Sequence, residues 1–263
     1  MRIAGRTHRG RVRDHNEDSV FPDTEPSPPQ RLDLLIVADG VGGKRAGESA
    51  SKLAVDTILH MLPADLVDQL DTWLLPQAIT GVTAEANRRI HERAQGEEQL
   101  QGMATTLTWA LLKDDRAYIG HVGDSRAYLI HGGQIEQLTE DHTEAAKMVE
   151  MGLLTPEEAE QSRWGDVLTR ALGANPSVEL DFVDLELTQG DVLLLCTDGL
   201  TKHVSSDEIR NTVLAAQRPE LICMTLVDKS NQGGGTDNIS VVVAMVSIEG
   251  MNHAMGEGTD PGR

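Results

Sequence analysis

Apolar residues gather in short runs that are typical of buried β-strands. The longest runs are Leu34 to Ala38, Val192 to Cys196 and Val241 to Val246. Buried strands have about four to eight residues, whereas a helix that crosses a bilayer needs about 20 consecutive apolar residues. The pattern therefore predicts several buried strands and no membrane span.

Other stretches repeat their apolar residues at helical spacing, which predicts two amphipathic helices. The first stretch contains Ala50, Leu53, Ala54, Thr57, Ile58 and Met61, and the second contains Ile79, Val82, Ala86 and Ile90. Short β-like runs separated by turn residues follow between Thr105 and Leu138. Two later helix starts carry a capping residue with Glu three positions on, namely Thr155 with Glu158 and Ser205 with Glu208.

The order of these elements favours one α+β domain. Two helices, a run of strands and then mixed elements differ from the regular alternation of a parallel βαβ fold. We expect two mainly antiparallel sheets covered by helices, in a single domain over residues 1–248. The Pro-rich stretch Asp23 to Gln30 predicts a loop. The polar, Gly-rich residues 249–263 predict a flexible tail.

Charge and cysteine content narrow the possible partners. The 263 residues carry a formal net charge of −19, which argues against nucleic acid and anionic membranes as partners. The basic N-terminus is followed by no apolar segment, so we expect no secretory signal. The two cysteines, Cys196 and Cys223, lack motif spacing, which indicates buried thiols in a reducing compartment and a cytoplasmic location.

Several aspartates stand beside sharp turns at the expected ends of strands. Asp39-Gly40 and Asp198-Gly199 each follow an apolar run, and Asp237 leads into another. Taken singly, each segment is best explained as a plain turn, because Asp and Gly are common turn residues. Taken together, they suggest a site for Mg²⁺ or Mn²⁺, which prefer carboxylate and carbonyl oxygens. Bound cations would let an acidic protein accept an anionic substrate.

Seven short motifs, spread over about residues 5–246, resemble the metal-dependent protein phosphatases of type 2C (PPM type). They occur in the order of that family: Arg13-x-x-Asn16-Glu17-Asp18, Asp39-Gly40-Val41-Gly42-Gly43, Thr105-Thr106, Gly123-Asp124-Ser125-Arg126, Leu168-Thr169-Arg170-Ala171-Leu172-Gly173, Thr197-Asp198-Gly199 and Asp237-Asn238-Ile239-Ser240. Each is weak evidence alone, but seven in order are strong. The resemblance implies the αββα sandwich of that family, with a metal site at one edge of the sheets.

The resemblance also implies roles for individual residues. Asp39 would bridge two Mn²⁺ or Mg²⁺ ions, with the Gly40 carbonyl as a further ligand. The remaining ligands would be Asp198 and Asp237 at one ion, Glu17 and Asp18 at the other, and Asp124 at a third, weaker ion. Arg13 would hold the substrate phosphate, because a guanidinium matches phosphate oxygens in a planar fork. An ordinary surface charge is the alternative for Arg13.

The implied reaction is hydrolysis of phosphoserine or phosphothreonine in proteins. A hydroxide that bridges two metal ions would attack phosphorus in a single in-line step. Some relatives carry a His near the first metal motif as a proposed general acid, but Val41 follows Asp39-Gly40 here and the next His downstream is His60. We therefore expect a water on the third ion at Asp124 to protonate the leaving group. His121, His142 and His203 are better explained as structural or surface residues.

Residues 141–176 resemble the flap of bacterial members of this family. We expect this flap to shape substrate access, with Arg163 or Trp164 contacting the substrate. A purely structural helical insert is an equally good explanation.

Three other functions compete with this one. A pseudophosphatase would keep the fold without turnover, but the intact set of aspartates argues against it. A calcium-binding scaffold would lack catalysis, and the EF-hand loop pattern is absent. A related phosphatase that acts on an anti-sigma regulator is not excluded by the sequence. The resemblance favours a stand-alone bacterial serine/threonine phosphatase that is monomeric. Its partners would be phosphorylated proteins, the substrates of a Hanks-type Ser/Thr kinase.

Overall fold

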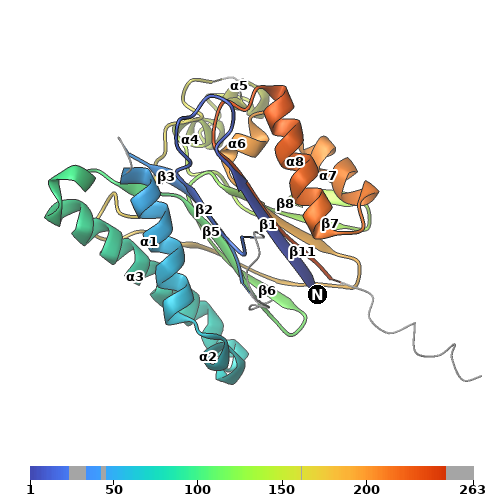
Figure 1. Ribbon diagram of the computed structural model, residues 1–263, viewed down its shortest axis with the longest axis horizontal. Helices are drawn as coiled ribbons and strands as arrows, with labels where there is room; N and C mark the ends of the chain where they lie inside the picture. The colour runs from blue at the N-terminus through green and yellow to red at the C-terminus, as the bar shows by residue number, and fades with distance from the viewer. Residues whose placement is uncertain (24–33, 43–45, 161, 247–263) are drawn as a thin grey trace, which may run out of the picture.

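The computed structural model describes residues 1–23, 34–42, 46–160 and 162–246. Two antiparallel sheets lie face to face, and helices cover the outer face of each sheet (Figure 1). The expected αββα sandwich of the α+β class is confirmed. The predicted loop at Asp23 to Gln30 lies mostly outside the described residues, and the predicted tail at 249–263 lies wholly outside them.

The first sheet joins the two ends of the chain. Its strand order is β1-β11-β10-β7-β8. The bounds are β1 (Arg2–His8), β7 (Arg126–His131), β8 (Gln134–Gln137), β10 (Val192–Cys196) and β11 (Ile239–Met245). The apolar strands β10 and β11 pair in the centre, with Cys196 opposite Val241.

The second sheet has the order β2-β3-β5-β6-β9, and the short β4 also pairs with β3. Its strands are β2 (Asp18–Phe21), β3 (Leu34–Val41), β4 (Ala104–Thr105), β5 (Leu107–Lys113), β6 (Arg116–Val122) and β9 (Asp181–Glu186). The edge strand β9 alternates between exposed and half-buried residues and was not predicted, because its apolar run is short and interrupted by acidic residues.

Helices pack on both outer faces. On the second sheet lie α1 (Ala46–Met61), α2 (Ala64–Gln69) and α3 (Leu75–Gly96), with the 3-10 helices η1 (Thr72–Leu74) and η2 (Glu98–Leu100). On the first sheet lie α6 (Asp198–Thr201), α7 (Ser206–Ala215) and α8 (Pro219–Gly233). The flap contains α4 (Glu144–Glu150) and α5 (Pro156–Glu160). Both predicted capping pairs are formed, at Thr155 with Glu158 and at Ser205 with Glu208.

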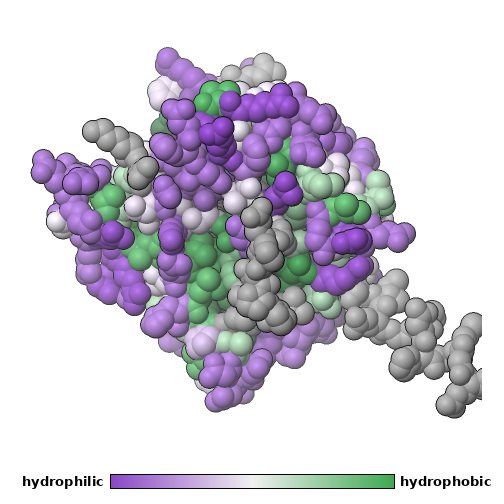
Figure 2. Space-filling view, viewed as in Figure 1, coloured by the Kyte–Doolittle hydropathy of each residue, from purple (hydrophilic) through white to green (hydrophobic). Residues whose placement is uncertain are grey.

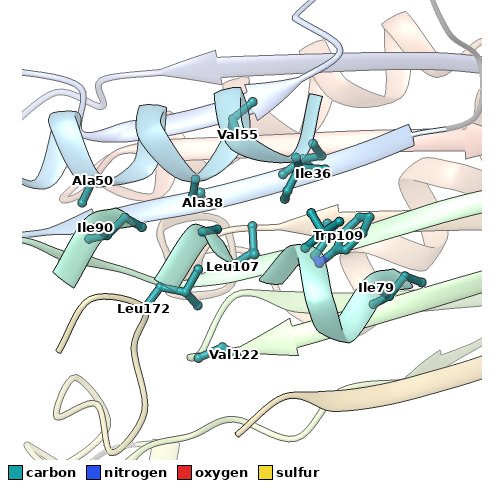
Figure 3. Packing of buried hydrophobic residues seen from close by; sticks show 14 of the residues in the cluster. Ile36, Ala38, Ala50, Val55, Ile79, Ile90, Leu107, Trp109, Val122 and Leu172 are labelled. Carbon is teal, nitrogen blue, oxygen red and sulfur yellow. The ribbon is translucent and has the colours of Figure 1, made fainter. Parts of the chain in front are cut away.

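The fully apolar strands have one face toward the helices and one toward the opposite sheet. Leu34 and Ile36 of β3 pack against α1 and α3, together with Trp109 of β5 (Figure 3). Leu35 and Val37, at the alternate positions of β3, pack between the two sheets. Because successive strand residues point to opposite faces, only a strand in an inner layer is apolar at every position. This burial fixes β3 and the carboxylate that it carries at its end.

The outer surface is mostly polar in the view of Figure 2, in which hydrophilic residues cover much of the helices on both sides of the sandwich. Within the described part of the chain, no helix has the length and apolarity that a membrane crossing requires.

Candidate metal centre

Acidic residues from distant parts of the chain meet where the two sheets come together at one end. Asp18 begins β2 and stands directly opposite Asp39 of β3 in the antiparallel ladder. Asp198 follows β10 and begins α6, and Asp237 precedes β11. The sequence pattern predicts Asp39 after the end of its strand, but β3 continues to Val41, because Gly40 and Val41 pair with Thr105 and Ala104 of β4.

Asp18 is held rigidly from one side. Its Oδ2 accepts hydrogen bonds from Thr197 Oγ1 at 2.9 Å and from Ser240 Oγ at 2.6 Å. Its Oδ1 is buried and has no hydrogen-bond partner among the residues that the structure describes. Burial raises the pKa of this carboxyl to about 7, although the bonds from Ser240 and Thr197 lower it. One oxygen of Asp18 is therefore oriented and desolvated, with no partner in the described part of the chain.

Asp39 lies at the electrostatic centre of the group. Burial raises its pKa well above the ordinary value, and the negative charges of Asp18, Asp198, Asp124 and Asp237 raise it further. Its backbone is fixed by Thr106, whose Oγ1 accepts from the Asp39 N–H at 2.9 Å and whose N–H donates to the Asp39 carbonyl at 2.9 Å. The charge of Asp39 is thus costly in the protein alone.

Gly40 leaves no room for a side chain. A Cβ at this position would stand 2.2 Å from the carbonyl oxygen of Gly47 at the start of α1. The Gly40 N–H donates to the Glu17 carbonyl at 3.2 Å. Burial raises the pKa of the Glu17 side chain. The loop before β2, the end of β3 and the start of α1 are therefore in close contact around the acidic group.

Asp198 and Asp237 are linked by basic side chains. Lys202 Nζ lies 2.6 Å from Asp198 Oδ2 and 3.0 Å from Asp237 Oδ2. Arg13 Nη2 lies 2.9 Å from the same Asp237 oxygen, and its side chain is half exposed. Burial raises the pKa of Asp198, and Lys202 partly offsets this rise. In the described part of the chain, the buried Asp198 Oδ1 has no hydrogen-bond partner. Arg13 is thus anchored beside the carboxylates with its guanidinium accessible.

Asp124 is a further buried carboxylate near the group, since its charge raises the pKa of Asp39. It lies between β6 and β7 and is 8% exposed. Burial, together with the charges of Asp198 and Asp141, raises its pKa to about 8. The preceding residue, Gly123, has φ 113° and donates its N–H to His142 Nδ1 at 3.0 Å. The buried His142 therefore has the structural role expected of it.

The chemistry of this group fits divalent cations. It combines mutually repelling carboxylates, raised pKa values and two buried carboxylate oxygens without partners, which are the properties expected of ligands for a hard cation. Among the residues that the structure describes, however, no three His, Cys, Asp or Glu side chains have the spacing of a formed metal site.

The flap packs beside this centre. A cleft of about 940 Å³ is lined by Asp124, Asp198 and Lys202 on one side and by residues of α4 and α5 on the other. In the flap, the guanidinium of Arg163 stacks on the ring of Trp164 at 4.7 Å, and Trp164 is 38% exposed. The flap residue that contacts a basic side chain of the centre is Asp166, at 3.1 Å from Lys202 Nζ. Contact of Arg163 or Trp164 with substrate stays a prediction.

Two residues of the centre had no role assigned from the sequence. Lys202 carries no motif signal, because its importance depends on Asp166 and Asp237, which are distant in sequence. Asn238 lies within a quoted motif and is 4% exposed. Its Nδ2 donates to the carbonyls of Arg9 and His15, and its Oδ1 accepts from the Glu17 N–H at 2.8 Å. Asn238 therefore fixes the loop that carries Arg13 and Glu17.

Replacing Asn238 by Ala is expected to lower the free energy of unfolding by about 2–3 kcal/mol, because buried backbone groups lose their partners. Denaturant unfolding of the metal-free protein measures this change. Asn211→Ala is the matched control, since Asn211 is exposed on α7 and accepts only a long bond from Arg210 at 3.4 Å. Its effect should stay within about 0.5 kcal/mol. Equal effects of the two substitutions would contradict a clamping role for Asn238.

The cysteines take no part in this centre. Cys196 and Cys223 are free and buried, which confirms the expectation of buried thiols. Burial raises the pKa of each thiol to about 12. Neither is a thiolate near neutral pH, so neither can serve as a nucleophile there.

Comparisons with known proteins point to one family. The sequence model described as protein phosphatase 2C matches residues 4–222. The serine/threonine phosphatase stp of Listeria welshimeri is 36% identical over 249 residues, which cover 92% of this chain and 95% of that protein. The serine/threonine protein phosphatase PstP of Mycobacterium tuberculosis is 37% identical over 252 residues, which cover 94% of this chain and 45% of PstP. A crystal structure of the PstP catalytic domain in complex with two manganese ions is 36% identical, covers 94% of this chain and 98% of that one, and superposes with a TM-score of 0.81.

Proposed function

Because this chain belongs to the protein phosphatase 2C family, we propose that it hydrolyses phosphoserine and phosphothreonine in proteins with the help of Mn²⁺ or Mg²⁺. The expected enzyme class, a serine/threonine protein phosphatase, is confirmed by this membership. The observation that carries the metal requirement is the set of buried, mutually repelling carboxylates, with unpartnered oxygens on Asp18 and Asp198. Divalent cations would relieve that repulsion.

The metal ligands that we propose are carried by four segments. Asp39 is the ligand that two ions would share in this proposal, because the negative charges of both Asp18 and Asp198 raise its pKa. Asp198 and Asp237 would complete one site, and Glu17, Asp18 and the Gly40 carbonyl the other. Bound ions supply positive charge at the phosphoryl group and an activated water as nucleophile. The protein supplies rigid positions for the ligands through Thr106, Thr197 and Ser240.

Arg13 is the proposed phosphate-binding residue. One guanidinium nitrogen is fixed by Asp237, and the half-exposed side chain leaves further N–H donors free to reach phosphate oxygens. Burial lowers the pKa of Arg13, but the carboxylates of Asp237, Asp39 and Glu17 more than compensate, so its pKa is raised. Its positive charge is thus permanent, and it can stabilise negative charge on the equatorial oxygens during in-line attack.

A third, weaker ion at Asp124 is part of the proposal. Asp124 is buried at the edge of the flap cleft and carries a raised pKa for the same reason as the other carboxyls. We propose that a water at this position protonates the leaving alkoxide, since the structure places His60 within α1, away from the end of β3 that carries Asp39. Unchanged hydrolysis and Mn²⁺ dependence in Asp124→Ala would contradict this role.

The phosphoproteins on which the enzyme acts are proposed to be products of a Hanks-type Ser/Thr kinase of the same cell. The support is chemical, because the phosphate esters that such an enzyme hydrolyses are those that a Ser/Thr kinase forms. A monomer is proposed as the active form.

Hydrolysis of phosphothreonine and phosphotyrosine peptides by the purified protein tests the function. We expect phosphate release from the phosphothreonine peptide with Mn²⁺, none after EDTA treatment, and full recovery when Mn²⁺ is added back. Failure of Mn²⁺ to restore activity, or turnover that persists in EDTA, would exclude the proposed mechanism. Faster hydrolysis of phosphotyrosine would contradict the substrate class.

A further inference from the structure

Lys202 joins the acidic centre to the flap. Its ammonium contacts three carboxylates, at 2.6 Å from Asp198, 3.0 Å from Asp237 and 3.1 Å from Asp166. The first two are proposed metal ligands, and the third belongs to the flap. The Lys202 side chain is 30% exposed, so its charge is partly removed from water. The contacts with the largely buried Asp198 and Asp237 are therefore stronger than an ordinary surface pair, whereas Asp166 is exposed.

Local structure places this ammonium beside Asp198. Lys202 follows the short helix α6, one turn after Asp198, and its N–H donates to the Asp198 carbonyl at 2.8 Å. The side chains of residues four positions apart meet on one face of a helical turn. Asp198 and Asp237 each offer an oxygen to Lys202, so the ammonium uses acceptor positions that a divalent cation would need.

The contact with Asp166 differs from the other attachments of the flap. Near its ends the flap is held by Arg126 with Asp141, at 2.6 Å, and by Arg170 with Asp181, at 2.5 Å. Neither of these two ion pairs contains a proposed metal ligand. Asp166 is 73% exposed, so its carboxylate can leave Lys202 for water at little cost. Its contact can therefore break without disturbing the ends of the flap.

We propose that Lys202 acts as a built-in counter-cation of the metal-free enzyme and as a latch for the flap. Its ammonium neutralises Asp198 and Asp237 and holds Asp166. Divalent ions that bind Asp198 and Asp237 repel the ammonium and displace it, and Asp166 is released with it. Metal loading thereby frees the flap, and the cleft opens to a phosphoprotein once the catalytic ions are present. This inference rests on the proposed metal site.

Titration calorimetry of metal-stripped full-length protein with Mn²⁺ tests the counter-cation role. Lys202→Met keeps the length of the side chain and removes the charge, so Mn²⁺ should bind about tenfold more tightly than to the wild type. In EDTA, the same variant should melt at a lower temperature. Lys147→Met is the matched control, because the ion pair that Lys147 forms in the described structure lies within the flap, with Glu144 at 3.7 Å. The Mn²⁺ affinity of this control should be unchanged. Equal or weaker Mn²⁺ binding by Lys202→Met would overturn the proposal.

Hydrogen exchange of the flap tests the latch, and it does not depend on the folding of the Lys202 variant. Mn²⁺ should speed amide exchange in a peptide covering residues 162–170 of the wild type. In Asp166→Asn the exchange should already be fast without metal and should no longer respond to Mn²⁺. Asp207→Asn removes an exposed carboxylate paired with Arg210 and should behave as the wild type. A flap that does not respond to Mn²⁺ in the wild type, or responds equally in Asp166→Asn, would overturn the latch.

The two proposals fail in different ways. If the wild type takes up no Mn²⁺ in calorimetry, the metal requirement of the proposed function is wrong. If the wild type binds Mn²⁺ and is active, but the Lys202 and Asp166 variants bind Mn²⁺ and exchange as the wild type does, only the role of Lys202 is wrong.

Discussion

Replacing Asp39 by Asn is expected to abolish phosphopeptide hydrolysis and, at the same time, to stabilise the metal-free protein. An amide is a poor ligand for the two ions that Asp39 is proposed to share, so kcat/KM should fall on the order of 10³-fold or more. The stability should change in the opposite direction. At neutral pH the unfolded Asp39 is ionised, whereas in the folded protein burial and four neighbouring carboxylates favour its protonated form. Asn removes this cost.

The expected gain is about 1–2 kcal/mol in the free energy of unfolding at pH 7.5, the size found when a strained functional residue is replaced. Thermal unfolding in EDTA measures it, and phosphopeptide assays with excess Mn²⁺ measure the loss of activity. Asp56→Asn is the control, since Asp56 is exposed on α1 and should leave both quantities unchanged. An Asp39→Asn variant that was both inactive and less stable in EDTA would indicate a structural role for Asp39 and would contradict the proposed metal centre.

The layers of the fold could be predicted because they follow from local patterns. The apolar runs at Leu34 and Val192 predict the inner strands β3 and β10. The helical repeats from Ala50 and Ile79 predict α1 and α3, which cover the second sheet. The strand β9 could not be predicted in this way. Its exposed acidic residues, Asp184 and Glu186, weaken the apolar signal. Its place is set by pairing with β6, between chain segments 60 to 70 residues apart.

The acidic residues of the centre could be named from the motifs, but their arrangement could not. The pairing of Asp18 with Asp39 needs the register of two strands, and the contact of Asp18 with Thr197 spans 179 residues. Lys202 and Asn238 show the limit most clearly. A lysine one turn after Asp198 has the pattern of an ordinary exposed i,i+4 pair. Only the approach of Asp237 and Asp166 makes it the counter-charge of the centre.

The affinity for Mn²⁺ is expected to rise steeply between pH 6 and pH 8. The pKa values of Asp18 and Asp124 are raised to about 7 and about 8, mainly by burial. Below these values the carboxyls carry protons that a metal ion must displace, so the observed affinity should increase by about tenfold per pH unit for each proton released. Calorimetry in two buffers of different ionisation enthalpy gives the number of protons directly.

The stability of the metal-free protein should change in the opposite sense. A carboxyl with a raised pKa binds more protons in the folded than in the unfolded state, so its contribution is complete below about pH 4 and is lost as the pH rises through about 7 for Asp18 and about 8 for Asp124. His121, whose pKa burial lowers to about 4, acts in the other direction, but only below its unfolded value of about 6.5. Between pH 6.5 and pH 8 the melting temperature in EDTA should therefore fall, while the increase on adding Mn²⁺ should grow. A Mn²⁺-induced shift that stayed constant over this range would show that metal binding does not deprotonate these carboxyls, and the acidic centre would not be the metal site.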